Sequence, residues 1–234
     1  MIILPMKNRS KEYEINPSKI IALGLNYLDH IKESVSQATS KSKGIPEEPV
    51  LFNKTPNVLI ENGSDIIIPN FLDRYNFKNP RVDYEAELAI IINRRGKDIP
   101  EKKAREYILG FTCMNDVSQR NLQTGDDSGW FRGKSLDTFG PIGPIIVPPD
   151  QIDDPQNLDI ECRLNGKTVQ ASNTSKMIFK IPEIISFISQ NFTLEKDDII
   201  MTGTPSGVGP IANGDIVEIE IENIGILKNK VREE

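Results

Sequence analysis

The chain has 234 residues, of which 38% are hydrophobic and 26% are charged, and its formal net charge is −6. These values are typical of a soluble globular protein, and the length suits one large domain or a domain with a small appendage. The acidic balance, with a pI of about 5.1, argues against a nucleic-acid-binding surface. The apolar start is too short for a signal peptide and no stretch is long enough to span a membrane. We therefore expect a cytoplasmic protein whose two cysteines, Cys113 and Cys162, are reduced.

The first part of the chain predicts strands followed by a single histidine. Residues 1–19 are expected to form a short N-terminal segment with one or two strands, ahead of a main domain over residues 20–234. Residues 20–24 predict a buried strand, and a helical turn after it would place His30 and Glu33 in contact. A carboxylate beside an imidazole raises its basicity and suits a general base. A surface pair without a function would have the same spacing.

A polar segment over residues 34–44 follows, with almost no large apolar side chain. Its composition predicts a mobile loop, which is either a lid that closes over the candidate base or a plain surface insertion. Residues 46–54 predict a short extended piece and residues 66–68 a strand ended by a proline. Residues 70–81 predict a loop.

Residues 82–92 form the most informative stretch. Glu85 and Glu87 are two residues apart ahead of an apolar, β-prone run, so on a strand both carboxylates would point to one face. Hard divalent cations prefer such oxygen ligands, although the solvent face of an edge strand can carry the same pattern. The spacing recurs over residues 218–222, where the glutamates alternate with apolar residues and are expected to be solvated.

The middle of the chain predicts a helix, a strand and a long loop. The helix covers residues 99–109 and is closed by Gly110. A buried strand over residues 111–117 ends in polar residues, and a helical turn follows. The loop over residues 124–143 is long enough to suggest a function, and a strand follows it at residues 145–147.

The last part contains the clearest local signals. Asn165-Gly166 predicts a two-residue hairpin turn between strands at 160–164 and 167–171. Residues 181–191 predict a helix whose isoleucines face the core. Residues 198–202 predict a strand that runs into a glycine-rich loop. Strands outnumber helices without regular βαβ alternation, so we expect a β-dominated α+β fold with antiparallel or mixed sheets.

Six stretches together resemble the fumarylacetoacetate hydrolase family, and they occur in the family's order over residues 20–222. The matching residues are Gly24-Leu25-Asn26-Tyr27 with His30 and Glu33; Pro46, Pro49, Phe52 and Lys54; Asp83-Tyr84-Glu85-Ala86-Glu87-Leu88-Ala89; Asn115-Asp116-Val117-Ser118 with Arg120 and Gln123; Gly133-Lys134-Ser135 with Asp137-Thr138-Phe139-Gly140-Pro141; and Thr202-Gly203-Thr204-Pro205 with Gly207-Val208-Gly209. Each stretch is weak alone, and the six in register are specific.

The resemblance implies a mixed β-sheet roll with few short helices, and a homodimer. It also implies that Glu85, Glu87 and Asp116 hold a divalent ion, Mg²⁺ or Mn²⁺, with Ca²⁺ as a further candidate. The hydrolase that names the family carries one more acidic ligand ahead of the histidine motif, where this chain has Ala22-Leu23-Gly24-Leu25. The chain is therefore similar to the shorter, three-carboxylate branch of the family.

The expected chemistry starts from a 2-oxo acid that binds the ion through its carboxylate and keto oxygens. In hydrolysis, His30 oriented by Glu33 would activate water, and Lys134 would stabilise the developing negative charge. The remaining residues expected to position the substrate are Arg120, Gln123 and Thr204.

These expectations predict a metal-dependent hydrolase that cleaves a C–C bond in a 2,4-dioxo acid such as an acylpyruvate. Oxaloacetate decarboxylation and the isomerisation or decarboxylation of 2-hydroxyhepta-2,4-diene-1,7-dioate stay open, because the same residues serve all three outcomes. A non-catalytic protein with a structural ion is the alternative from another class.

Overall fold

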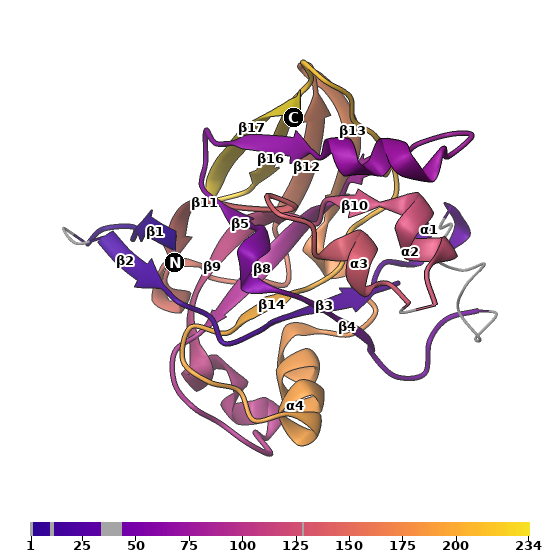
Figure 1. The fold of residues 1–234 in the computed structure, drawn as a ribbon. Coiled ribbons are helices and arrows are strands. Elements are labelled where there is room, and N and C mark those ends of the chain that lie inside the picture. The colour runs from indigo at the N-terminus through magenta and orange to yellow at the C-terminus, as the bar shows by residue number, and fades with distance from the viewer. Residues whose placement is uncertain (1, 10–11, 34–43, 128) are drawn as a thin grey trace.

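The structure is a computed structural model that describes residues 2–9, 12–33, 44–127 and 129–234, with the backbone alone for residues 31–33. The segment expected to be a mobile loop or lid therefore falls outside the described residues. Strands dominate the described chain and helices are short, as predicted (Figure 1).

A seven-stranded mixed sheet crosses the centre of the molecule (Figure 1). Its order is β4 (Val50–Lys54), β3 (Ile20–Gly24), β14 (Ile199–Met201), β8 (Ala86–Ile92), β9 (Ile108–Asn115), β11 (Gly140–Val147) and β5 (Leu59–Ile60). The pairs β3–β14 and β11–β5 are parallel, and the other neighbours are antiparallel. Strand β4 is an edge of this sheet.

A second, five-stranded sheet lies above the first in Figure 1. Its order is β13 (Lys167–Asn173), β12 (Asp159–Leu164), β16 (Ile216–Ile221), β17 (Gly225–Glu233) and β6 (Asp65–Ile68). Two small sheets complete the strands: β10 (Ser118–Gln119) with β7 (Val82–Tyr84) and β15 (Gly209–Pro210), and β1 (Ile2–Pro5) with β2 (Glu12–Ile15). The fold is thus the mixed β-sheet roll that the sequence indicated.

Strand β8 is buried on both faces, which explains its continuous apolar sequence. Leu88 and Ile90 belong to the main core cluster, which includes residues of the five-stranded sheet. Ala89 and Ile91 point the other way, into a cluster that includes the apolar residues of β1. Because β8 lies between the two clusters, side chains at its N-terminal end are held in a fixed direction.

The helices are short apart from one. They are α1 (Leu28–Glu33), α2 (Arg120–Gly125), α3 (Phe131–Lys134) and α4 (Ile181–Asn191), with 3₁₀ turns η2 (Pro56–Val58), η3 (Asn70–Tyr75), η4 (Glu101–Tyr107), η5 (Pro149–Gln151) and η6 (Thr174–Lys176). Helix α4 buries its isoleucines, as its 3.6-residue pattern predicts. No helix in the described ranges is long and apolar enough to cross a bilayer.

The predicted hairpin is confirmed. Strands β12 and β13 pair in antiparallel register around Asn165 and Gly166, which have φ values of +52° and +79°. Two consecutive positive φ values match a primed turn, the type that Asn-Gly favours.

The prediction of a helix over residues 99–109 is wrong both in the type of helix and in the residue at which it ends. The segment is the 3₁₀ helix η4, and the buried Ile108 already starts β9 opposite Ile92. Gly110 lies inside β9 and does not end a helix. A Cβ there would lie 2.4 Å from Ile146 Cγ2, so the glycine allows β11 to pack closely.

Three other predictions need correction. The loop over residues 124–143 contains α3 and the start of β11, and the loop over 70–81 contains η3. Glu218 and Glu220 are half-buried and pair with Arg163, at 3.4 and 2.7 Å, and so are not simply solvated. The alternating apolar residues of β16 are buried as predicted.

Asp198 fixes the start of β14 and is fully buried. Its Oδ1 accepts hydrogen bonds from Ser18 N and Oγ and from Lys19 N, and its Oδ2 accepts one from Glu195 N at 2.7 Å. We expect Asp198→Ala to lower the free energy of unfolding by on the order of 2 kcal/mol, because it removes the acceptor of several part-buried hydrogen bonds. Urea unfolding followed by circular dichroism measures this. The exposed Asp153→Ala serves as control and should change stability by less than about 0.5 kcal/mol; equal stability of the two variants would refute the assignment.

Candidate functional site

The two glutamates lie at a break between two strands, β7 and β8. Glu85 lies between β7 and β8, so the stretch expected to be one strand is two. The backbone N–H groups at this break donate hydrogen bonds to side chains far away in sequence. Glu85 N donates to Asn115 Oδ1 at 3.0 Å, and Ala86 N donates to Gln170 Oε1 at 3.0 Å. Asp116 N donates to the carbonyl oxygen of Glu85 at 2.9 Å. These bonds hold Glu85 beside the end of β9.

Glu85, Glu87 and Asp116 form a compact carboxylate group. Each offers an oxygen within 4.8 Å of the others, and all three residues are buried. Their approach follows from the β8–β9 register, which pairs Glu87 with Met114, two residues before Asp116. Buried carboxylates this close repel one another unless a cation lies among them. The donor set, all oxygen, fits a hard divalent ion.

Two buried lysines contact the carboxylate group. Lys54 Nζ lies 2.6 Å from Asp116 Oδ1 and donates to the carbonyl oxygen of Val117 at 3.2 Å. Lys134 Nζ bonds Asp116 Oδ2 and lies 3.1 Å from Glu85 Oε1. Lys134 is fixed because α3 packs on the backbone of α2: a Cβ at Gly133 would lie 2.6 Å from Gln123 N.

The surroundings shift the pKa values of the carboxyls in opposite directions. Burial opposes the ionisation of Glu85, but the charges of Lys134, Arg120 and His30 outweigh it and hold its pKa below the usual range. Burial and the charges of Asp116 and Glu85 raise the pKa of Glu87 well above its usual range. Glu87 accepts a hydrogen bond from Gly203 N at 2.8 Å. A divalent cation in the group would favour the ionised form of both glutamates.

Arg120 is held by three neighbours. Its Nε lies 2.7 Å from Asp83 Oδ2, its Nη1 donates to Gln123 Oε1 at 2.8 Å, and its Nη2 lies 2.5 Å from Glu85 Oε1. Asp83 also accepts from Arg81 Nε at 2.7 Å. Three of the five guanidinium N–H groups are therefore engaged, one each with Asp83, Gln123 and Glu85, which leaves two others.

A small cavity opens beside the carboxylate group. Its volume of about 10 Å³ is enough for about one water molecule. Its polar lining residues are His30, Glu85, Gln123, Lys134 and Thr204, and its apolar ones include Leu23, Leu25, Phe52 and Trp130. Five of the nine site residues expected from the sequence thus share one cavity. Glu87, Asp116 and Arg120 contact Glu85 or lie within the same carboxylate group, and the side chain of Glu33 lies outside the described residues.

The sequence did not indicate three buried polar residues of this site as functional. Lys54 and Asp83 matched the family pattern without a role, and Gln170 was taken only as part of a hairpin. Gln170 Nε2 donates to Thr204 Oγ1 at 2.9 Å and to the carbonyl oxygen of Pro205 at 2.8 Å, which places Thr204 at the cavity. Besides the family pattern, the position of Lys54 at the end of a largely apolar strand could have indicated that it is buried and functional.

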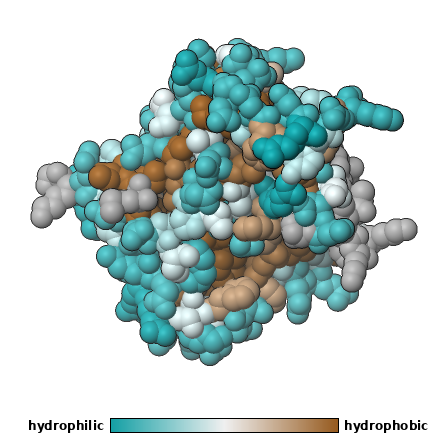
Figure 2. Space-filling model, in the orientation of Figure 1, coloured by the Kyte–Doolittle hydropathy of each residue, from teal (hydrophilic) through white to brown (hydrophobic). Residues whose placement is uncertain are grey.

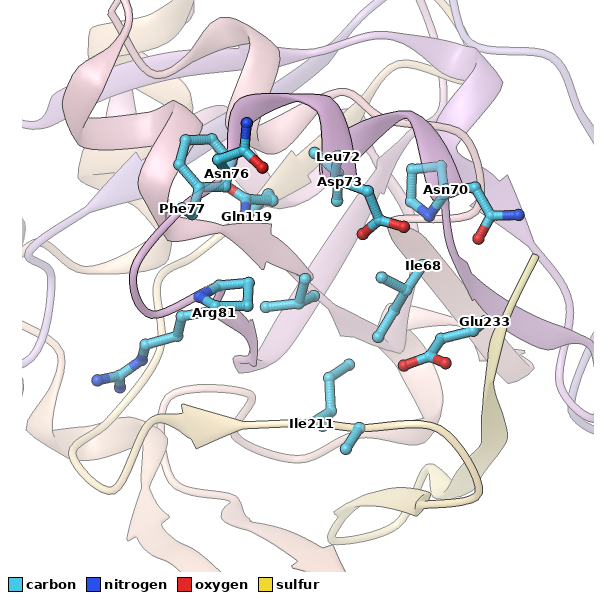
Figure 3. Close-up of a pocket in the computed structure, with 14 residues that line it drawn as sticks. Ile68, Asn70, Leu72, Asp73, Asn76, Phe77, Arg81, Gln119, Ile211 and Glu233 are labelled. Carbon is cyan, nitrogen blue, oxygen red and sulfur yellow. The ribbon is translucent and has the colours of Figure 1, made fainter.

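A larger cavity of about 460 Å³ lies elsewhere, between η3, the loop before β16 and the end of β17 (Figure 3). Ile68, Val82 and Ile211 line it, and Asp73 and Glu233 carry carboxylates on separate elements around it (Figure 3). The carboxylate group found in the described residues lies outside this cavity. Size alone therefore does not identify the reactive site.

We expect Glu87→Gln to weaken Mn²⁺ binding by on the order of 100-fold, because it removes one charged oxygen ligand and keeps the shape and the bond from Gly203 N. Electron paramagnetic resonance titration of free Mn²⁺ measures the affinity, with the exposed Glu101→Gln as control. Unchanged affinity would remove Glu87 from the site. A structural ion should also raise the melting temperature sharply on binding, whereas a catalytic ion should affect activity first.

We expect Asp83→Asn to weaken Mn²⁺ binding by about 10–100-fold, because it loosens Arg120 and with it the orientation of Glu85. The matched control is Asp73→Asn, at an exposed carboxylate of η3. If Asp83→Asn changes only the melting temperature and leaves the Mn²⁺ affinity at the wild-type value, Asp83 has no positioning role.

One protein-family model and several known proteins are similar to most of this chain. The protein-family model described as "Fumarylacetoacetate (FAA) hydrolase C-terminal" matches residues 19–232. Oxaloacetate tautomerase FAHD2A, mitochondrial, from Bos taurus is 40% identical over 92% of this chain and 67% of its own length. The crystal structure of 5-carboxymethyl-2-hydroxymuconate delta-isomerase from Mycobacterium smegmatis is 37% identical, with a TM-score of 0.81 over 97% of this chain and 86% of the other.

The fumarylpyruvate hydrolase from Pseudomonas aeruginosa, solved with Mn²⁺ and pyruvate, has a TM-score of 0.84 and 25% identity over 100% of this chain and 96% of its own. The carboxylate group described above, together with this relative, supports a divalent metal here. The chain belongs to the fumarylacetoacetate hydrolase family.

Proposed function

We propose that this protein is a divalent-metal-dependent hydrolase that cleaves the C–C bond of a 2,4-dioxo acid such as an acylpyruvate. The observation that carries the proposal is that His30, the only histidine of the chain, lines the same cavity as Glu85 and Lys134. A candidate base, a candidate metal ligand and a fixed cation thus face one small space.

The carboxylates of Glu85, Glu87 and Asp116 would hold Mg²⁺ or Mn²⁺. Such an ion supplies Lewis acidity to the oxygens of a 2-oxo acid. Two N–H groups of Arg120 and the side chains of Gln123 and Thr204 would orient the substrate carboxylate.

The chain's own residues would move the proton. His30 takes a proton from water, the hydroxide adds to the distal carbonyl carbon, and the bond between that carbon and C3 breaks. The electron pair goes to C3, which takes the proton from His30, so the products are a carboxylic acid and pyruvate and His30 is neutral again. Lys134 stabilises the developing negative charge, and Glu33 is expected to orient His30.

We further propose that the protein is a homodimer and lies in the cytoplasm. Ca²⁺ is a further candidate for the bound ion. These parts rest on the resemblance to the family and on composition.

A second candidate is the interconversion of the keto and enol forms of oxaloacetate, with decarboxylation of the same acid as its variant. The 40% identity to a protein named oxaloacetate tautomerase favours it. In this reaction His30 would carry a proton to or from C3 without any attack by water.

We expect His30→Ala to lower acylpyruvate cleavage by roughly 10²–10⁴-fold, the usual contribution of a positioned base. A coupled assay for pyruvate release measures cleavage, and Mn²⁺ affinity should stay within about threefold of wild type because His30 is not a proposed ligand. Oxaloacetate enolisation and decarboxylation are measured with the same protein.

Three outcomes separate the candidates. Loss of cleavage with intact Mn²⁺ affinity supports the hydrolase. Intact cleavage in His30→Ala, or no cleavage of any acylpyruvate by the wild type, overturns it. Fast enolisation of oxaloacetate without cleavage favours the second candidate.

A further inference from the structure

On the proposed function, one end of the substrate binds at the carboxylate group and the other end lies remote from it. The small cavity beside the carboxylate group has room for about one water molecule. A dioxo acid whose carboxylate and keto oxygens lie beside Glu85 is too long for this cavity, whose apolar lining includes Phe52 and Trp130.

Phe52 and Trp130 form one aromatic wall. Their ring centroids are 5.2 Å apart and their planes meet at 68°, an edge-to-face contact. Trp130 fits closely against β3, because a Cβ at Gly24 would lie 2.7 Å from its Cζ3 atom. On the other side, Lys134 Nζ lies 4.9 Å from the centre of the Phe52 ring. Phe52 thus contacts the same lysine that contacts the carboxylate group.

An apolar groove of about 330 Å³ lies beyond this wall. Phe52 and Trp130 line both this groove and the small cavity beside the carboxylate group. The groove runs along the edge strand β4. Its other lining residues are Val50, Leu51, Asn53 and Phe131. Figure 2 shows apolar colour on this face where β3 and β4 lie in Figure 1. A volume of this size suits a small ligand group.

Among the described residues, those that line this groove carry no charge. The nearby cations of the described chain already have acidic partners: Lys134 pairs with Asp116 and Glu85, and Arg132 pairs with Asp126. A second carboxylate placed in the groove would lose water without gaining one of these partners, which is unfavourable. An alkyl or aryl group there would remove apolar surface from water, which is favourable.

We propose that Phe52 and Trp130 select a 2-oxo acid whose far end is an uncharged apolar group and disfavour one that ends in a second carboxylate. The substrate class is then an acylpyruvate with an alkyl or aryl acyl group. Trp130 and Phe52 act as specificity-determining residues that contact the substrate beyond the bond that breaks.

Unreactive analogues test the inference separately from the reaction. N-butyl oxamate and N-(3-carboxypropyl) oxamate present the same chelating end, and they differ by a terminal carboxylate. Calorimetry on the Mn²⁺-loaded protein should show that N-butyl oxamate binds at least about tenfold tighter than N-(3-carboxypropyl) oxamate. Each methylene added to the alkyl chain of N-butyl oxamate should tighten binding by about threefold more. Trp130→Ala should lose most of this preference. Trp130→Arg should reverse it, and the control Phe192→Ala, at an exposed aromatic residue, should keep it.

Equal or tighter binding of the carboxypropyl analogue by the wild type overturns the inference, as does failure of both analogues to bind. A preference that survives in both Trp130→Ala and Phe52→Ala overturns the assignment to this wall. If the preference is present and sensitive to Trp130 while no alkyl or aryl acylpyruvate is cleaved, the inference stands and the proposed hydrolase activity fails.

Discussion

The structure depends on the burial of three carboxylates within 4.8 Å of one another. Such a group is stable only where cations and N–H donors replace the lost water. Here Lys54 and Lys134 contact Asp116, and Arg120 contacts Glu85. The requirement explains why basic residues from β4, α2 and α3 converge on one end of the central sheet, and why each of them is buried.

The scaffold meets this requirement with its most rigid parts. Strand β8 has core clusters on both faces, and the β8–β9 register sets the position of Glu87 relative to Asp116. The break after β7 turns Glu85 into the same space without leaving backbone donors unpaired, because Asn115 and Gln170 accept from them. Strand β8 and the ends of its neighbouring strands supply the candidate metal ligands, while short helices supply most of the residues proposed to surround the substrate.

What the sequence predicted well was local. The Asn165-Gly166 hairpin and the isoleucine face of α4 each depend on a few neighbouring residues, and both are confirmed. The gathering of Glu85, Glu87 and Asp116 needed the family resemblance, because an identical spacing in β16 has no such role. Gln170 could not be predicted, since its partner Ala86 is 84 residues away and the contact exists only after the two sheets fold together. The strand at Ile108 was missed because burial against Ile92 outweighed its local helical propensity.

Helix α3 has one consequence for how this scaffold can diversify. Lys134 is at its end and is locked in place by the contact of Gly133 with the backbone of α2, whereas Trp130 directly precedes the helix at the cavity wall. A mutation at Trp130 can therefore reshape the ligand space while the lysine and the carboxylates stay where they are. If Phe52 and Trp130 select the substrate as we propose, single substitutions at this wall would exchange one substrate for another while Lys134 and the carboxylates are kept.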